Sequence, residues 1–138
     1  MISSLLYKSK AVQPPYSVTD LEIMREADRH NPGAGITGFL VRSEWTYLQV
    51  LEGPSHEVEA LSARIRKDPR HGGYHEIQLL KAPERRFGSW SMGYLDLSGQ
   101  SNSLTAIIPG LTSSSADSLK SQALHELERI ARKQEGRP

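Results

Sequence analysis

The chain contains no cysteine, which excludes a disulfide framework, a thiol nucleophile and a cysteine-ligated metal. Neither sign of charge dominates, because 17 basic residues stand against 16 acidic ones, and a net charge of +1 lacks the basic excess of a dedicated nucleic-acid binder. No apolar run approaches the length of a signal peptide or a membrane span. The sequence therefore predicts a cytoplasmic protein without direct nucleic-acid or membrane partners. His56, His75 and His125 lack the spacing of metal ligands, so no metal site is predicted.

What the chain does have is a succession of short apolar segments. Its 138 residues, 37% of them hydrophobic, fit one domain with a real core. Strands are predicted at residues 2–9, 36–41, 47–51, 75–80 and 90–95. Helical spacing between the first and second strands, and between the third and fourth, predicts two helices. The order β-α-β-β-α-β-β predicts an α+β, ferredoxin-like fold: a five-stranded mixed sheet with both helices on one face.

Local signals indicate where the two helices begin and end. Thr19 with Glu22 three residues later matches a capping box and predicts the start of the first helix. The run Asn31–Gly33 predicts its end. Ser55 is predicted to cap the second helix, which Asp68 and the following proline then stop.

The last third of the chain differs in composition. The serine-rich stretch 98–103 predicts a linker, and residues 113–133 predict a helix with Leu119, Ala123 and Leu127 on one side. This helical cap is expected either to cover the second sheet face or to meet a partner. We divide the chain into a domain at 1–97 and a linker with a helical extension at 98–138, whose final residues, Gln134–Pro138, are expected to be frayed.

Gln49 is the residue that the pattern explains least well. It lies in a strand that is apolar on both faces, and an unpaired buried carboxamide costs about 1 to 3 kcal/mol. Gln49 therefore needs protein partners or a ligand that offers both donors and acceptors. Tyr7, Trp90 and Met92 also lie on predicted strands, and Asn31 ends the first helix. Together they predict a polar and aromatic site beside the sheet.

Five short motifs occur in the chain in a fixed order. They are Tyr7-Lys8-Ser9, His30-Asn31 before Ile36-Thr37-Gly38, Gln49-Val50-Leu51-Glu52-Gly53, Asp68-Pro69-Arg70-His71, and Trp90-Ser91-Met92. One such motif is weak, but five in this order are improbable by chance. Over about residues 1 to 95 the chain resembles the BLUF family, sensors of blue light using FAD.

The resemblance implies noncovalently bound FAD with its isoalloxazine ring between the two helices. Ile23 and Ile65 are candidates for the apolar walls of that site. Asn31 and Gln49 can each offer donors and acceptors at once, so we expect them at the pyrimidine edge of the flavin.

The ribityl chain and the phosphates need polar partners of their own. We expect them to be contacted by His30, Arg70 and His71, because the planar guanidinium of Arg70 suits phosphate oxygens. Asp68 is then expected to orient Arg70.

The family pattern also implies a photochemical role for four residues. Tyr7 gives an electron and then a proton to the photoexcited flavin, and recombination leaves Gln49 rotated or tautomerised with absorption shifted to the red. Trp90 and Met92, on the fifth strand, are expected to pass the change to the C-terminal helices. The expected protein is a flavoprotein photoreceptor, a homo-oligomer without enzymatic turnover that signals to an unidentified downstream partner.

Two positions depart from the family pattern. Arg42 follows the second strand, where an aromatic residue is common, and Trp45 occupies a hairpin position that is often small. Both are expected at the rim of the domain, away from the flavin.

Two other interpretations stay open at this point. The chain could be an acylphosphatase-like hydrolase, in which Arg70 and Asn31 hold a phosphate and orient water; it would then be colourless. It could also be a BLUF-derived scaffold that only mediates association, without a photoproduct. Absorption spectra before and after a blue flash distinguish the three.

Overall fold

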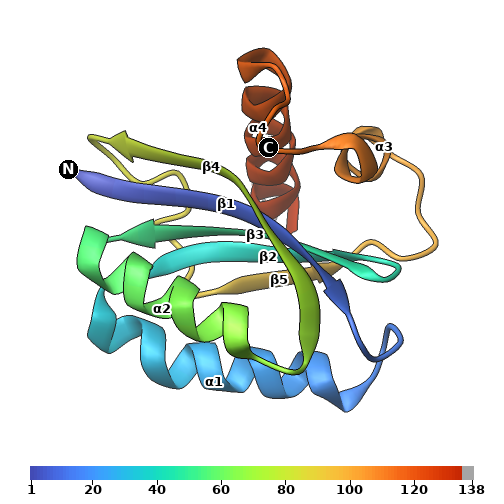
Figure 1. The fold of residues 1–138 in the computed structure, drawn as a ribbon, viewed down its shortest axis with the longest axis horizontal. Helices are drawn as coiled ribbons and strands as arrows, with labels where there is room; N and C mark the ends of the chain where they lie inside the picture. The colour runs from blue at the N-terminus through green and yellow to red at the C-terminus, as the bar shows by residue number, and fades with distance from the viewer. Residues whose placement is uncertain (135–138) are drawn as a thin grey trace.

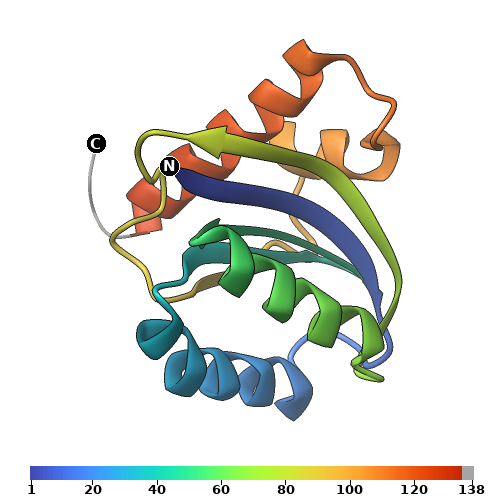
Figure 2. The same cartoon turned by 60° about the vertical axis from the view of Figure 1, so that its left-hand side comes forward.

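The structure is a computed structural model and describes residues 1–134. Their strands form one sheet, and helices cover both of its faces (Figures 1 and 2). The strands are β1 (Ile2–Ala11), β2 (Thr37–Ser43), β3 (Thr46–Gly53), β4 (His71–Ala82) and β5 (Gly93–Asp96). The helices are α1 (Val18–Ala34), α2 (Ser55–Lys67), α3 (Ser103–Ile107), the 3-10 turn η1 (Ile108–Gly110) and α4 (Asp117–Gln134). The predicted ferredoxin-like, five-stranded mixed sheet is confirmed.

The sheet has the strand order β4-β1-β3-β2-β5, with β2 and β5 parallel and the other pairs antiparallel. In the β1–β3 pair, Tyr7 lies directly opposite Gln49. Opposed residues of an antiparallel pair share one face of the sheet. Register alone therefore makes these two side chains neighbours in the centre of the sheet.

Alternation along the strands divides the core into two layers. Leu5 and Tyr7 face the layer under α1 and α2, whereas Leu6 faces the layer under α3 and α4. Figure 2 shows the two pairs of helices on opposite sides of the sheet. The α4 side chains Ala123, Leu127 and others are buried against the sheet, so the predicted helical cap covers the second face within the same chain.

The predicted helix ends were wrong in three places. Asn31 does not end α1: the helix continues through Pro32 to Ala34, and Gly35, with a φ of 68°, closes it so that the Ile36 N–H donates to the Asn31 carbonyl (3.0 Å). The residue before the first turn of α1 is Ser17, not Thr19, and the one before α2 is Pro54, not Ser55. Neither makes a side-chain capping bond, so the starts of these helices are stabilised without one.

The predicted fifth strand was also wrong at its start. The segment 90–92 is not strand, and β5 begins only at Gly93. Hydrogen bonds from other strands hold this segment and the residues just before it. The Glu52 carboxylate accepts from the backbone N–H groups of Arg86 and Phe87 (both 2.8 Å), and the Gly38 N–H donates to the Trp90 carbonyl (3.1 Å). Strand alternation therefore does not apply here.

As a result, Trp90 and Met92 do not share a face. Trp90 packs in the layer under α4, and Met92 packs in the layer under α1 and α2.

The C-terminal region contains a helix, α3, that its serine-rich sequence did not predict. The predicted linker gives way to α3 at Ser103, where the Asn102 side chain accepts from the Thr105 N–H (2.9 Å) in a capping box. The last helix begins at Asp117, four residues later than predicted, and includes Gln134; residues 135–138 lie outside the described part. Among residues 1–134, no helix combines the length and apolar character needed to cross a bilayer.

Arg42 contradicts the prediction that it lies at the rim. Its side chain is completely buried, and Nη1 donates to Asp20 Oδ1 (3.0 Å) and to the Tyr47 hydroxyl (3.2 Å). Buried side-chain and carbonyl oxygens around the guanidinium make its burial possible. Trp45 is 51% exposed, as a rim position predicts.

Candidate functional site

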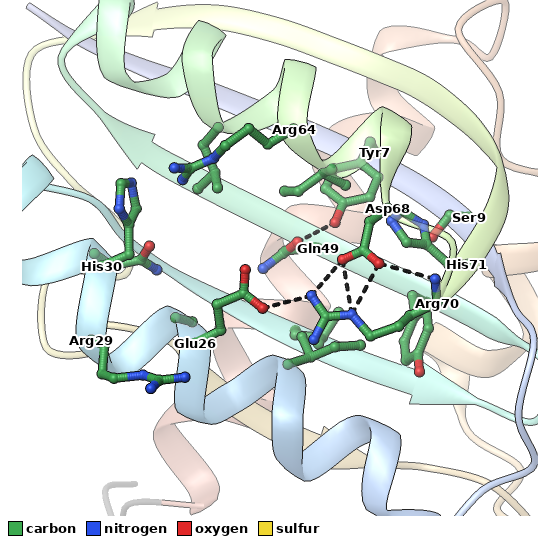
Figure 3. A pocket seen from close by; sticks show the side chains of 17 residues that line it. Tyr7, Ser9, Glu26, Arg29, His30, Gln49, Arg64, Asp68, Arg70 and His71 are labelled. Carbon is green, nitrogen blue, oxygen red and sulfur yellow. Dashed lines mark hydrogen bonds and ion pairs between the residues drawn. The ribbon is translucent and has the colours of Figure 1, made fainter.

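A cavity of about 410 Å³ lies between the sheet and the two helices α1 and α2 (Figure 3). Its apolar walls come from the two helices and from β2: Ile23, Ala27, Leu40, Leu61 and Ile65. Side chains at i and i+4 share one face of a helix, which is why Ile23 and Ala27 of α1, and Leu61 and Ile65 of α2, line the same space. Two aliphatic walls between flanking helices suit a flat aromatic ligand.

Tyr7 and Gln49 form the floor of this cavity. Both side chains are buried, and the Tyr7 hydroxyl donates to Gln49 Oε1. The carboxamide nitrogen of Gln49 donates to Met92 Sδ (3.1 Å). Gln49 thus connects a phenol on β1 to the thioether that precedes β5. Burial raises the pKa of Tyr7 above its ordinary range, so the phenol keeps its proton and acts as a donor.

Asn31 approaches the cavity from the end of α1. It is buried, and Nδ2 donates to the Ser91 carbonyl (3.0 Å), which ties α1 to the segment just before β5. Asn31 and Gln49 therefore both line the cavity and both contact residues 91–92. Two carboxamides on one wall present mixed donors and acceptors to a ligand.

An ion-pair cluster closes one end of the cavity. Arg70 Nε donates to both Asp68 oxygens (2.9 and 3.0 Å), and Arg70 Nη2 reaches Glu26 Oε2 (2.7 Å) on α1 (Figure 3). Burial alone would raise the pKa of Asp68, but the bonds from Arg70 outweigh it and hold that pKa below its ordinary value. The bonds to Asp68 in turn raise the pKa of Arg70, so the pair is ionised.

Two polar atoms at the cavity have no partner within residues 1–134. They are Ser9 Oγ and His71 Nδ1, both buried. Burial lowers the pKa of His71 below its ordinary value, which favours a neutral imidazole. Unpaired buried polar atoms are rare, and these two are placed to bind a polar part of a ligand.

Further basic side chains line the cavity away from Arg70. Figure 3 shows Arg29, His30 and Arg64 on the side of the cavity opposite the Asp68–Arg70 pair. Guanidinium groups bind phosphate oxygens through paired N–H donors, so this side suits an anionic group.

The structure brings nine of the residues predicted for the site around this one cavity: Tyr7, Ile23, His30, Asn31, Gln49, Ile65, Asp68, Arg70 and His71. Met92 contacts Gln49 without lining the cavity, and Trp90 lies on the other sheet face, 5.5 Å from Phe39 between ring centroids. The roles of all eleven stay predictions.

Several lining residues were not singled out from the sequence. They are Ser9, Glu26, Ala27, Arg29, Leu40, Tyr47, Leu61 and Arg64. Some had a usable signal: Ser9 shares the strand face of Tyr7, and Arg64 lies three positions after Leu61 on α2. Others, such as Tyr47, follow only from the register between strands.

Comparison with known proteins identifies the family. A family model described as "Sensors of blue-light using FAD" matches residues 2–93, two thirds of the chain. The chain belongs to the BLUF family. The predicted resemblance is thereby confirmed, and FAD is the cofactor that the family description names.

Curated BLUF relatives are much longer than this chain. The "Blue light- and temperature-regulated antirepressor BluF" of Escherichia coli (strain K12) is 35% identical over 98 residues, covering 70% of this chain and 24% of that protein. The "Photoactivated adenylate cyclase subunit beta" of Euglena gracilis is 36% identical over 92 residues, covering 66% and 11%. The chain thus spans a quarter or less of the length of these two relatives.

Solved structures of similar length match nearly the whole chain. The dark-state structure of BlrB, a BLUF protein, has a TM-score of 0.75 and 28% identity, and covers 96% of both chains. The photo-activated state of BlsA has a TM-score of 0.76 and 26% identity, covering 93% of this chain and 95% of that one. Coverage this high includes the C-terminal helices, which lie beyond the region that the family model matches.

The residues present fit FAD. The two aliphatic walls suit the flavin ring, the carboxamides of Asn31 and Gln49 suit its polar edge, and the arginines suit the diphosphate. The partnerless oxygen of Ser9 and ring nitrogen of His71 provide hydrogen-bonding capacity that the protein itself leaves unused.

Proposed function

We propose that this BLUF protein is a blue-light photoreceptor that binds FAD noncovalently and signals to a partner protein without turning over a substrate. The observation that carries the proposal is the buried chain of bonds from the Tyr7 hydroxyl through the Gln49 carboxamide to Met92 Sδ. Hydrogen bonds thereby join, at the wall of one cavity, the oxidisable phenol of Tyr7, the Gln49 carboxamide, which can rotate and return, and the thioether of Met92. The family description supports the same function.

The proposed placement of FAD follows the chemistry of the walls. Ile23 and Ile65 hold the ring between α1 and α2, and Asn31 and Gln49 bind its pyrimidine edge. The ribityl chain and phosphates meet His30, Arg70 and His71, the first on the opposite side of the cavity from the other two (Figure 3). Asp68 keeps the Arg70 fork in place.

When bound, FAD would supply the light-driven oxidant, and Tyr7 would give up one electron and its hydroxyl proton and take both back on recombination. The Tyr7 O–H bond points at Gln49 Oε1, so its proton leaves along an existing hydrogen bond. Loss and return of that proton allow the Gln49 carboxamide to rotate or tautomerise.

Rotation of Gln49 alters its bond to Met92. After rotation, Nε2 faces Tyr7 and Oε1 faces Met92, and a carbonyl oxygen cannot donate to the thioether. The bond of 3.1 Å is then lost. Met92 immediately precedes β5, so we propose that the change in hydrogen bonding reaches the sheet edge there.

The signal then has a short route to the C-terminal helix. The Gln134 side chain of α4 donates to the Tyr94 carbonyl of β5 (3.0 Å), and Trp90, two residues before Met92, packs in the layer under α4. We propose that α4 presents the output to the partner. Self-association of the chain is also proposed, and the exposed apolar side chains Leu79 and Leu80 on the edge strand β4 support it.

The test is the visible absorption of the FAD-loaded protein before and after a blue flash. We expect a reversible small red shift of an oxidised-flavin spectrum. Tyr7→Phe removes the oxidisable phenol and Gln49→Ala the amide, so each should keep FAD and lose the red-shifted state. Tyr16→Phe, at an 82% exposed tyrosine, is the matched control and should behave like the parent protein.

Each alternative interpretation has its own outcome in this experiment. A flavin-bound protein without any shift supports the scaffold. A protein that stays colourless with added FAD and hydrolyses acyl phosphates supports the hydrolase. A complete photocycle in Tyr7→Phe or Gln49→Ala would contradict the role proposed for the substituted residue, although the protein would still be a light sensor.

A further inference from the structure

Tyr7 has an aromatic neighbour that none of the family motifs contains. The ring of Tyr74 stacks on the ring of Tyr7 with centroids 4.6 Å apart and planes 24° from parallel. Tyr74 comes from β4, beside β1, where the pairing shifts register between Leu6 and Tyr7. This irregularity lies next to the residue on which the photochemistry is proposed to depend.

A cation lies over the ring of Tyr74. The guanidinium carbon of Arg66, on α2, lies 4.7 Å from the centroid of the Tyr74 ring, and Arg66 Nη2 pairs with Glu76 Oε1 at 3.5 Å. The Arg66 side chain is 53% exposed. A layered arrangement therefore runs from the buried ring of Tyr7, through Tyr74, to a charge at the surface.

The two stacked phenols differ in where their protons can go. The Tyr7 hydroxyl has an acceptor in Gln49 Oε1. The Tyr74 oxygen is buried, and no group among residues 1–134 accepts its proton. An oxidised phenol becomes strongly acidic and is stabilised by losing its proton. Of the two phenols, only Tyr7 therefore has an acceptor for the proton that oxidation would release.

We propose that Tyr74 is a positioning residue for the photochemistry, which holds the Tyr7 ring so that its hydroxyl points at Gln49 and shares the positive charge left when Tyr7 loses an electron. This inference rests on the proposed function. One electron leaves the stacked pair for the excited flavin, the Tyr7 O–H bond breaks, and its proton follows through Gln49. On recombination both return to Tyr7, and Tyr74 keeps its O–H bond throughout.

A substitution at Arg66 can distinguish charge sharing by Tyr74 from simple packing of its ring on Tyr7. Its charge lies 4.7 Å from the centre of the Tyr74 ring and opposes positive charge in the stack. Arg66→Gln removes that charge at an exposed position without touching the Tyr7 ring. Electron loss from Tyr7 should then become faster, which packing alone does not predict.

The first readout needs no flavin. Tyrosine ring-flip rates are measured by NMR in the flavin-free protein carrying labelled tyrosine. Tyr74→Phe keeps the stacked ring and should leave the flip rate of Tyr7 within about twofold of the parent. Tyr74→Leu removes the ring and should raise that rate at least about tenfold; Tyr74→Met serves if the leucine variant does not fold.

The second readout is the yield of the red-shifted state per absorbed photon in the FAD-loaded protein. It should be unchanged in Tyr74→Phe, at least about threefold lower in Tyr74→Leu or Tyr74→Met, and higher in Arg66→Gln. Parental flip rate and yield in both aliphatic variants would overturn the inference, as would an Arg66→Gln yield equal to that of the parent. A full photocycle in Tyr7→Phe overturns instead the proposed function on which it rests.

Discussion

Asp20 receives hydrogen bonds from side chains on three different strands. Arg42 of β2 and Tyr47 of β3 donate to Oδ1, and the Tyr94 hydroxyl of β5 donates to Oδ2 (2.5 Å). Arg42 also donates from Nε to the Glu44 carbonyl (2.8 Å). A buried guanidinium is tolerated only when its donors are satisfied and its charge is paired. One carboxylate therefore fixes α1 to three strands at the end of the sheet near the β2–β3 hairpin.

Removing the charge of Asp20 should consequently be severe. We expect Asp20→Asn to lower the free energy of unfolding by about 3 to 5 kcal/mol, because Arg42 is left as an unpaired buried cation. The measurement is urea denaturation of the flavin-free protein. Glu128→Gln is the control: it breaks a partly exposed i,i+4 pair with Arg132 and a longer contact with Arg86, and should cost less than about 1 kcal/mol. Equal losses for both variants would contradict a structural role for the buried pair.

Burial explains which residues could be assigned from the sequence. Gln49 was conspicuous because a carboxamide in apolar surroundings needs partners, whereas Asn31 was indicated by its place at the predicted helix end and by the motif around it; the structure places both at the cavity. Arg42 was misplaced because an arginine next to a turn is ordinarily solvated. Its burial depends on Asp20, 22 positions away, and single-residue patterns cannot show such a partner. Tyr74 was missed for the same reason, since stacking is a product of strand register.

At the scale of elements, the sheet was more predictable than its ends. Four predicted strands overlap closely with observed ones, because period-two alternation is a property of the strand itself. Residues 90–92 break that rule because Glu52 and Gly38 hold them from outside. α3 escaped prediction because its residues alone do not form a convincing helix; it packs onto α4 through the fully buried Leu104.

The packing of α4 on the sheet can be tested through Leu127. This side chain is fully buried in the layer that α4 covers. Leu127→Ala should cost about 2 to 5 kcal/mol of unfolding free energy, the range for creating a cavity in a packed core. Ser121→Ala, on the exposed side of the same helix, should stay within about 0.5 kcal/mol. A small effect at Leu127 would mean that α4 detaches readily in solution, and the proposed output route would then need another contact.

At the scale of the whole molecule, the cavity exists only when the sheet and both helices are assembled. Its lining comes from β1, α1, β2, β3, α2, the turn at 68–70 and the start of β4, so the unfolded chain offers no comparable site. A ligand that binds only the folded state stabilises it by RT ln(1 + [L]/Kd). Cofactor binding and folding are therefore coupled, and thermal unfolding reports on the site without any photochemistry.

Adding FAD to the flavin-free protein should raise the free energy of unfolding by about 2.7 kcal/mol at a concentration one hundred times Kd, with a corresponding rise in Tm. ADP offers the diphosphate and adenosine but no flavin ring, so it can use the arginines and not the space between Ile23 and Ile65. It should stabilise the protein far less at equal concentration. If ADP matched FAD, the apolar walls would contribute nothing to affinity, and the ring could not lie between the two helices. If FAD stabilises the protein far more than ADP does, the flavin ring itself contributes to affinity, as binding between Ile23 and Ile65 requires.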